Sequence, residues 1–177
     1  MSENNIAFIG MNRTAQISCA EYLKRNYDYK RMEMDDALKH FIKTCYYFDK
    51  WQNIKFDEKL RLYDAIYKTD PKIFITHAKR RAEKSRTPVV ISDVRYIDEL
   101  NELRKMDFIV VRVTTNVKEP PIRRLAKSAN EGSVAVSLMY DKSFAVNHSV
   151  DFSVNWTSKA TTGNIMEPLI ARIINKS

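Results

Sequence analysis

Two hydrophobic patterns alternate along this chain. Short, continuous apolar runs, such as residues 6–9 and 108–111, are typical of strands that are covered on both faces of a sheet. Between them lie longer segments with apolar residues at helical spacing. The last of these, residues 164–175, sets isoleucine, leucine and methionine against charged residues on the opposite side. The alternation predicts a parallel sheet flanked by helices and joined by right-handed crossovers.

The pattern gives approximate bounds for each element. We expect strands at residues 5–10, 29–34, 88–93, 108–113 and 151–155. Helices are expected at residues 16–26, 35–49, 56–68, 71–85, 96–105 and 164–175, with a helical lid-like region at residues 119–147. These elements predict a three-layer α/β fold with a mostly five-stranded parallel sheet, in one domain over residues 1–177. Ligands of such sheets bind beyond the carboxyl ends of the strands.

Composition narrows the class of protein. Of the 177 residues, 44% are hydrophobic and 29% are charged, as is ordinary for a globular domain. No apolar stretch is long enough for a membrane span, and no signal-peptide pattern is visible. Cys19 and Cys45 lack metal spacing and suggest no disulfide framework. We therefore expect a cytoplasmic protein.

Much of the net charge of +8 is crowded into residues 79–86 and 123–127. Such segments occur on ordinary solvated surfaces, on proteins that handle nucleotides and on nucleic-acid-binding proteins. Interleaved aromatic residues, on which bases could stack, are missing from these segments. The charge therefore allows nucleic-acid binding, but we rank this interpretation last of the three.

The junction of the first strand and the first helix has the setting of a phosphate-binding loop. Residues 10–18 read GMNRTAQIS and follow the apolar strand directly. A P-loop wraps phosphate with backbone N–H groups and places a lysine between the β- and γ-phosphates. Here Ala15 stands at the second glycine position and Gln16 at the lysine position. The chain therefore keeps the strand–loop–helix pattern of a P-loop but lacks its second glycine and its lysine.

The remaining loop positions leave two interpretations open. Ile17 takes the place of the hydroxyl that would hold Mg²⁺, and Ser18 follows as the only substitute. Arg13 and Thr14 can still donate hydrogen bonds to an anion. Alternatively, this is an ordinary strand-to-helix turn in which Gly10 ends the strand.

Two further groups of residues could carry chemistry. At the end of the third strand, Asp93 could orient Mg²⁺ through water or cap the next helix, and Arg95 could bind a phosphate in bidentate fashion. After the second strand, Asp35 or Asp36 could cap the next helix, or one of these carboxylates could accept from a sugar or base, while Lys39 could meet a phosphate. Mobile arginines can stabilise a transferring phosphoryl group, and of Arg80, Arg81, Arg123 and Arg124 we expect one or two to matter.

Taken together, these segments resemble the bacteriophage deoxynucleoside monophosphate kinases, a branch of the P-loop kinases. The resemblance extends over nearly the whole chain in order, and its most specific part is the run VISDVRY at residues 90–96, with Glu99. The other matching segments are residues 6–23, residues 36–39, residues 70–71 with Arg80 and Arg81, and residues 150–155.

The resemblance implies a fold, cofactors and roles. It implies ATP and Mg²⁺ as cofactors and a deoxynucleoside monophosphate as acceptor. Asp93, Arg95 and Arg124 would be catalytic, with Arg124 in a lid over residues 119–147. Ser18 and Asp93 would lie near the metal. Asp36, Lys39, Arg81 and Arg95 would bind the substrate, and relatives are often dimeric, which leaves a homodimer or a protein partner open.

The departures from the family pattern bear on activity. Losing a charged contact to the transition state costs about 3–4 kcal/mol, or roughly 10²–10³ in rate. Three hypotheses follow: a working kinase in which Arg13 or a lid arginine replaces the lysine, a pseudokinase that binds a nucleotide or a protein, and a nucleic-acid-associated module. The loop favours the second hypothesis, while the intact Asp93-Val94-Arg95 run favours retained nucleotide or phosphate binding.

Overall fold

A computed structural model describes residues 4–10, 13–46, 54–115, 149–157 and 161–176. Five parallel strands form one sheet in the order β2-β3-β1-β4-β5. The strands are β1 (Ile6–Gly10), β2 (Lys30–Met32), β3 (Val89–Ile91), β4 (Ile109–Thr115) and β5 (Phe152–Trp156). The described helices are α1 (Arg13–Asn26), α2 (Asp36–Tyr46), α3 (Phe56–Thr69), α4 (Lys72–Glu83), α5 (Ile97–Lys105) and α9 (Thr162–Lys176).

This architecture confirms the predicted α/β fold with a five-stranded parallel sheet. Most element bounds agree with the sequence prediction within a few residues. Helix α1 differs, because it begins at Arg13 rather than at residue 16. The expected lid at residues 119–147 and the last residues of the expected helix 35–49 lie outside the described residues. Within the described part of the chain, no helix is long and apolar enough to cross a membrane.

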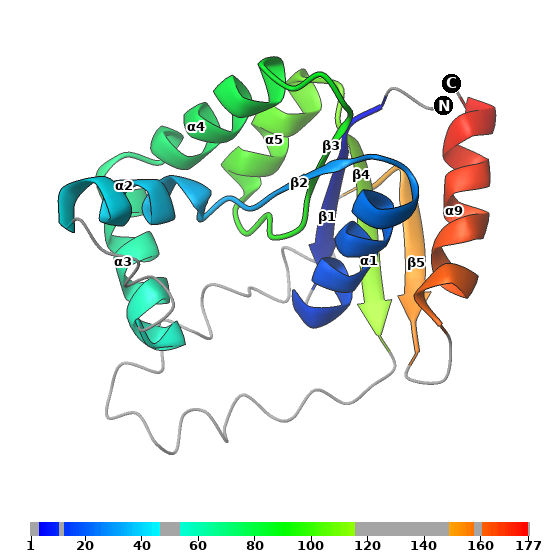
Figure 1. Ribbon diagram of the computed structural model, residues 1–177, viewed down its shortest axis with the longest axis horizontal. Coiled ribbons are helices and arrows are strands. Elements are labelled where there is room, and N and C mark those ends of the chain that lie inside the picture. Colours follow the sequence, from blue (N-terminus) through cyan, green and yellow to red (C-terminus); the bar gives the residue numbers. More distant parts are fainter. Residues whose placement is uncertain (1–3, 11–12, 47–53, 116–148, 158–160, 177) are drawn as a thin grey trace.

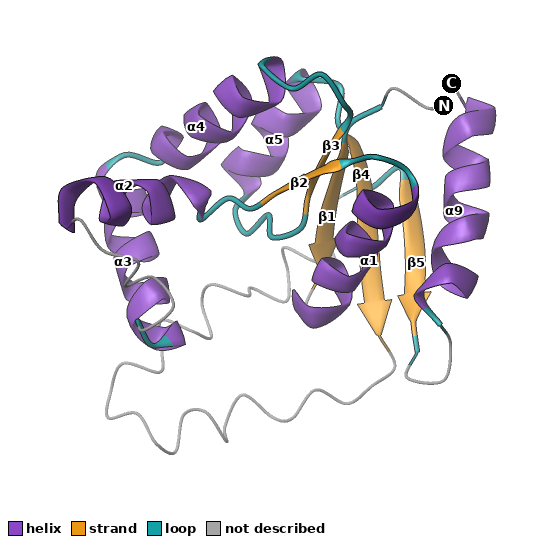
Figure 2. Cartoon of the chain, viewed as in Figure 1, coloured by secondary structure: helices purple, strands orange, loops and turns teal. Residues whose placement is uncertain are grey.

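Alternating side chains of the strands build two cores, one on each face of the sheet. Ala7 and Ile9 of β1 belong to the cluster formed with α2, α3, α4 and α5. Ile6 and Phe8 point to the other face and pack with α1 and α9. Figure 1 shows α1 in front of the sheet, α9 beside β5, and the other helices gathered near β2 and β3. Figure 2 shows the same layers by element type.

The sheet order brings two sets of polar residues together. β2 pairs in parallel with β3, with Met32 opposite Ile91. The segments that follow these two strands therefore begin side by side, at the carboxyl ends of the strands. β1 lies on the other side of β3, so the start of α1 also lies at this end.

Gly10 ends β1 in a backbone conformation that favours glycine. Its φ is 154°, and a Cβ atom at this position would lie 2.3 Å from the carbonyl oxygen of Val113 on β4. The neighbouring backbone cannot yield easily, since Gly10 and Val113 are paired in the sheet. This geometry supports the interpretation that Gly10 is a glycine because it ends β1 close to the backbone of β4.

We expect Gly10→Ala to lower the free energy of unfolding by about 2–4 kcal/mol, because it adds backbone strain and a close contact. Chemical denaturation followed by circular dichroism measures this change. Gly163→Ala is the matched control, because its Cβ would meet only the Tyr22 side chain, at 3.4 Å. In helix α9 that substitution should be neutral or stabilising by up to about 1 kcal/mol. Equal effects of the two substitutions would contradict the conclusion that the backbone at Gly10 requires glycine.

Candidate functional site

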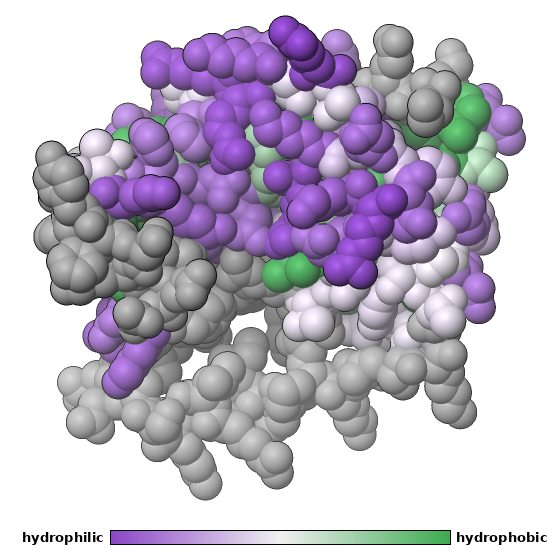
Figure 3. Space-filling model, in the orientation of Figure 1, coloured by the Kyte–Doolittle hydropathy of each residue, from purple (hydrophilic) through white to green (hydrophobic). Residues whose placement is uncertain are grey.

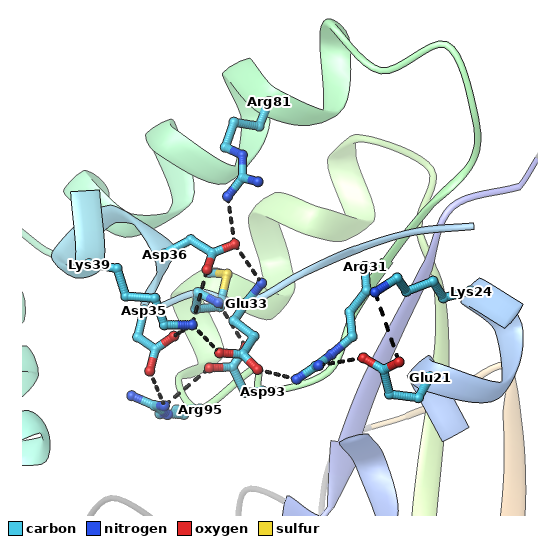
Figure 4. Close-up of polar contacts among 11 residues, drawn as sticks. Glu21, Lys24, Arg31, Glu33, Asp35, Asp36, Lys39, Arg81, Asp93 and Arg95 are labelled. Carbon is cyan, nitrogen blue, oxygen red and sulfur yellow. Dashed lines mark hydrogen bonds and ion pairs between the residues drawn. The ribbon is translucent and has the colours of Figure 1, made fainter. Parts of the chain in front are cut away.

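Charged side chains from three parts of the chain converge beyond the ends of β2 and β3 (Figure 4). They come from the β2–α2 junction and α2, from the segment after β3, and from α4. The group contains Glu33, Asp35, Asp36, Lys39, Arg81, Asp93 and Arg95, linked by hydrogen bonds and ion pairs. Five of these were predicted as site residues from the sequence: Asp36, Lys39, Arg81, Asp93 and Arg95. We call this group the charge cluster.

Asp93 connects the two strand ends. Its Oδ1 accepts a hydrogen bond of 2.7 Å from the backbone N–H of Met34, which follows β2. Its Oδ2 accepts one of 3.1 Å from Nη2 of Arg95. The cap position of α5 is occupied by Tyr96, so Asp93 does not have the helix-capping role that the sequence left open.

Arg95 is directed into the protein. Its side chain is only 2% exposed, and its guanidinium carbon lies 4.4 Å from the centroid of the Tyr63 ring on α3. That is cation–π geometry, which stabilises a desolvated cation. Nη2 also lies 3.9 Å from Oδ2 of Asp35. The arginine predicted to meet the acceptor phosphate is thus held by two carboxylates and an aromatic ring.

Glu99 holds the backbone at Arg95. The Glu99 side chain is fully buried and accepts hydrogen bonds from the backbone N–H groups of Arg95 and Tyr96, at 2.8 and 3.1 Å. The Tyr63 hydroxyl donates to its other oxygen. Burial raises the pKa of Glu99 above its usual value, although these hydrogen bonds oppose the shift. Burial likewise raises the pKa of Tyr63 well above normal, and the Glu99 charge adds to this.

Asp35 lies between two cations. It immediately precedes α2, and its carboxylate contacts Nη2 of Arg95 through Oδ2 and Nζ of Lys39 through Oδ1, the latter at 3.2 Å. Burial, followed by the charge of Asp93, raises the pKa of Asp35 to about 6. Burial and Asp93 thus act against the charge of this carboxylate, while Arg95 and Lys39 favour it.

Lys39 and Arg81 extend the cluster towards α4. The Lys39 ammonium contacts Glu33, Asp35 and Asp36, and Asp36 pairs in turn with Nη1 of Arg81 at 2.5 Å. Burial alone would lower the pKa of Lys39, but the three carboxylates raise it above its usual value. Burial alone would raise the pKa of Glu33, but the hydrogen bond and charge of Lys39, with the charge of Arg31, lower it to about 2.

Arg31 of β2 links the charge cluster to α1 through two ion pairs. It bridges Glu33 and Glu21, with 2.6 Å between its Nη1 and Oε1 of Glu21. Hydrophilic side chains gather over α4 and across the centre of this face of the molecule, between α2 and α1 (Figure 3). Sequence reasoning assigned no role to Arg31, Glu33, Tyr63 or Glu99. Of these, only Glu99 had a sequence signal, since it stands at the capping-box position three residues after Tyr96.

The residues expected to form a phosphate-binding loop belong to a helix instead. Helix α1 begins at Arg13, so residues 13–18 form its first turns. Gln16 is 2% exposed, and its Nε2 donates a hydrogen bond of 2.7 Å to the carbonyl oxygen of Gly10. Ala15 is buried in the core with α9, Thr14 is exposed, and Ile17 and Ser18 are half-buried. The expected nine-residue loop is therefore corrected: Gly10 belongs to β1 and residues 13–18 belong to α1, while residues 11–12 lie outside the described residues.

These residues do not fit the phosphate cradle of a P-loop. A cradle needs an extended loop whose N–H groups wrap the anion and a lysine that reaches it. Here the helix starts early, and the amide at the lysine position is bound to Gly10. Anion binding by Arg13 and Thr14 at the helix N-terminus stays a prediction.

A directly coordinated Mg²⁺ is also a poor fit to the charge cluster. Carboxylate oxygens of Glu33, Asp35 and Asp36 lie within 4.8 Å of one another, but the Lys39 ammonium contacts all three. Both oxygens of Asp93 accept hydrogen bonds. Ser18 lies on α1, and Arg124 falls outside the described residues. The metal roles of Ser18 and Asp93 stay predictions.

Comparison with known proteins identifies the fold. No protein-family model matches the chain, and no curated protein sequence matches it. A shikimate kinase from Aquifex aeolicus vf5 is similar, with a TM-score of 0.55, 10% identity and 97% of each chain covered. A dephospho-CoA kinase from Campylobacter jejuni has a TM-score of 0.53, 12% identity and coverage of 100% of this chain and 98% of that one. A gluconokinase from Sinorhizobium meliloti 1021 has a TM-score of 0.51, 14% identity and coverage of 99% and 94%.

At these identities the likeness establishes the fold alone. The chain shares the α/β fold of these three kinases, and its charge cluster lies beyond the carboxyl ends of the strands, where ligands of open α/β sheets bind.

Removing the Tyr63 hydroxyl tests the support of Arg95, because this hydroxyl donates to Glu99, which accepts the backbone N–H of Arg95. We expect Tyr63→Phe to lower the free energy of unfolding by about 1–3 kcal/mol, because buried Glu99 loses a donor. Tyr67→Phe is the control, because its hydroxyl donates to Asp98 at the surface; its effect should be below about 1 kcal/mol. Thermal and denaturant unfolding measure both variants. A neutral Tyr63→Phe would show that Glu99 does not depend on this bond.

Proposed function

We propose that this protein is a deoxynucleoside monophosphate kinase-like protein that binds its nucleotide at the charge cluster, with phosphoryl transfer strongly weakened or lost. The observation that carries the proposal is the convergence of Lys39, Arg81 and Arg95 beyond two adjacent parallel strands of a kinase-type fold. These cations come from separate segments of the chain, as in a site built for a polyanion. Guanidinium groups suit phosphate because they donate two parallel hydrogen bonds.

Each residue has a role in this proposal. Arg95, Lys39 and Arg81 bind the acceptor phosphate, and Asp36 accepts from the sugar or base. ATP with Mg²⁺ would be the phosphoryl donor, with Ser18 and Asp93 near the metal and Arg124 above the transferring group. Because the start of α1 does not fit a phosphate cradle, we assign no catalytic step to these groups.

The Gln16–Gly10 hydrogen bond favours weak catalysis. An uncharged amide that is buried and bound to the end of β1 supplies no positive charge to a β- or γ-phosphate. The second candidate function follows from this contact: a pseudokinase that binds a nucleotide, or a protein partner, without turnover. The two candidates share the nucleotide site and differ only in rate.

Nucleotide binding is testable by thermal shift with the four deoxynucleoside monophosphates. A ligand at about 100 times its Kd should stabilise the fold by roughly 2.7 kcal/mol. We expect Arg81→Gln to weaken binding about tenfold through the loss of a charged contact. Arg80→Gln, which changes the exposed neighbour on the same helix, should leave the affinity within about twofold. No stabilisation of the unmodified protein by several millimolar of any of the four would refute the proposal.

Turnover separates the two candidates. In a coupled assay with ATP, Mg²⁺ and each monophosphate, we expect rates well below about 1 s⁻¹, the lower end for kinases. Gln16→Lys should raise the rate less than about tenfold, because the early helix start remains. Asn26→Lys adds the same charge at the exposed last residue of α1 and should have no effect. A Gln16→Lys variant with ordinary kinase turnover would contradict this account of the loop.

A further inference from the structure

One carboxylate of the charge cluster lies where a phosphate would be expected. Oδ2 of Asp35 faces Nη2 of Arg95 at 3.9 Å, while Oδ1 faces Nζ of Lys39 at 3.2 Å. Two oxygens of one group thus bridge the two cations that come from neighbouring strand ends. A phosphate monoester that bridged the same cations would present its oxygens in a similar way.

We propose that the Asp35 carboxylate occupies the place of the acceptor phosphate in the ligand-free site and competes with phosphate monoesters for Arg95 and Lys39. This proposal rests on the proposed nucleotide site. A phosphate group must displace Asp35 from both cations before it can bind them. Asp35 therefore lowers the affinity of the site for phosphate groups, whereas a neutral ligand that does not need these cations is unaffected.

The charges of the cluster support displacement. Four carboxylates, Glu33, Asp35, Asp36 and Asp93, face the three cations Lys39, Arg81 and Arg95, while Arg31 is shared between Glu33 and Glu21. Asp35 is thus close to like charges as well as to its partners. Its side chain is 6% exposed, and burial with the charge of Asp93 raises its pKa. Burial and like charge therefore both act against the Asp35 carboxylate in this position.

The position of Asp35 before α2 makes the movement feasible. Its backbone carbonyl accepts a hydrogen bond from the N–H of Lys39, as at a helix start. This backbone hydrogen bond does not involve the carboxylate, so it persists when the Asp35 side chain rotates away from Arg95.

The test is isothermal titration calorimetry of Asp35→Asn at fixed ionic strength with three probes: a deoxynucleoside monophosphate, inorganic phosphate and the unphosphorylated deoxynucleoside. Because Asn keeps the shape and removes the competing charge, the affinities for the first two should rise about tenfold. The affinity for the deoxynucleoside should not change. Asp35→Ser, which also suits a helix start, is the second variant if Asn impairs folding.

Two controls separate local competition from net charge. Glu102→Gln removes a charge on α5 that pairs with Lys105, and should leave all three affinities unchanged. Glu33→Gln removes a carboxylate that pairs with Lys39 and Arg31 but forms no ion pair with Arg95 in the described structure, so it should raise phosphate affinity less than Asp35→Asn does.

The outcomes are distinguishable from those of the proposed function. If phosphate binds Asp35→Asn more tightly but no nucleotide binds any variant, the Asp35 inference stands and the nucleotide proposal fails. If nucleotides bind but Asp35→Asn leaves phosphate affinity unchanged or weaker, the nucleotide proposal stands and the Asp35 inference is overturned. Equal gains in Asp35→Asn and Glu33→Gln would also overturn it.

Discussion

The structure depends on how one arginine is kept charged inside the protein. Moving a cation out of water costs several kcal/mol unless partners replace the lost hydration. Arg95 obtains this replacement from two carboxylates, Asp93 and Asp35, and from the face of the Tyr63 ring. Each partner comes from a different segment, so satisfying Arg95 fixes the relative positions of β3, the β2–α2 junction and α3. Glu99 then fixes the backbone at Arg95 itself.

The ion pairs that keep these side chains charged inside the protein involve the same groups as the proposed function. The cations that would bind a phosphate are paired with carboxylates when no ligand is present, so the site is stable while empty. Those pairs also give any ligand a competitor to displace. The balance of opposite charges in the cluster would therefore set the affinity for an anionic ligand.

The fold was predictable because continuous apolar strands and amphipathic helices repeat along the chain. Asp93 and Arg95 were predictable because they follow a strand in a motif of known position. Tyr63 was not, since it lies 36 residues from Glu99 in sequence and the pair forms only in the folded protein. The start of α1 was misjudged because the comparison with a P-loop assumed a loop of full length, whereas the Gln16 amide binds the end of β1. The lid and Arg124 lie outside the described residues and stay predictions.

The shortness of β2 has a consequence for self-association. This edge strand has only three residues, one of them the exposed Lys30, and Arg31 is held by ion pairs on both sides. Edge strands that are short and charged are poor templates for the addition of a foreign strand. The ion pairs that hold Arg31 beside the charge cluster thus also make this border of the sheet a poor site for aggregation.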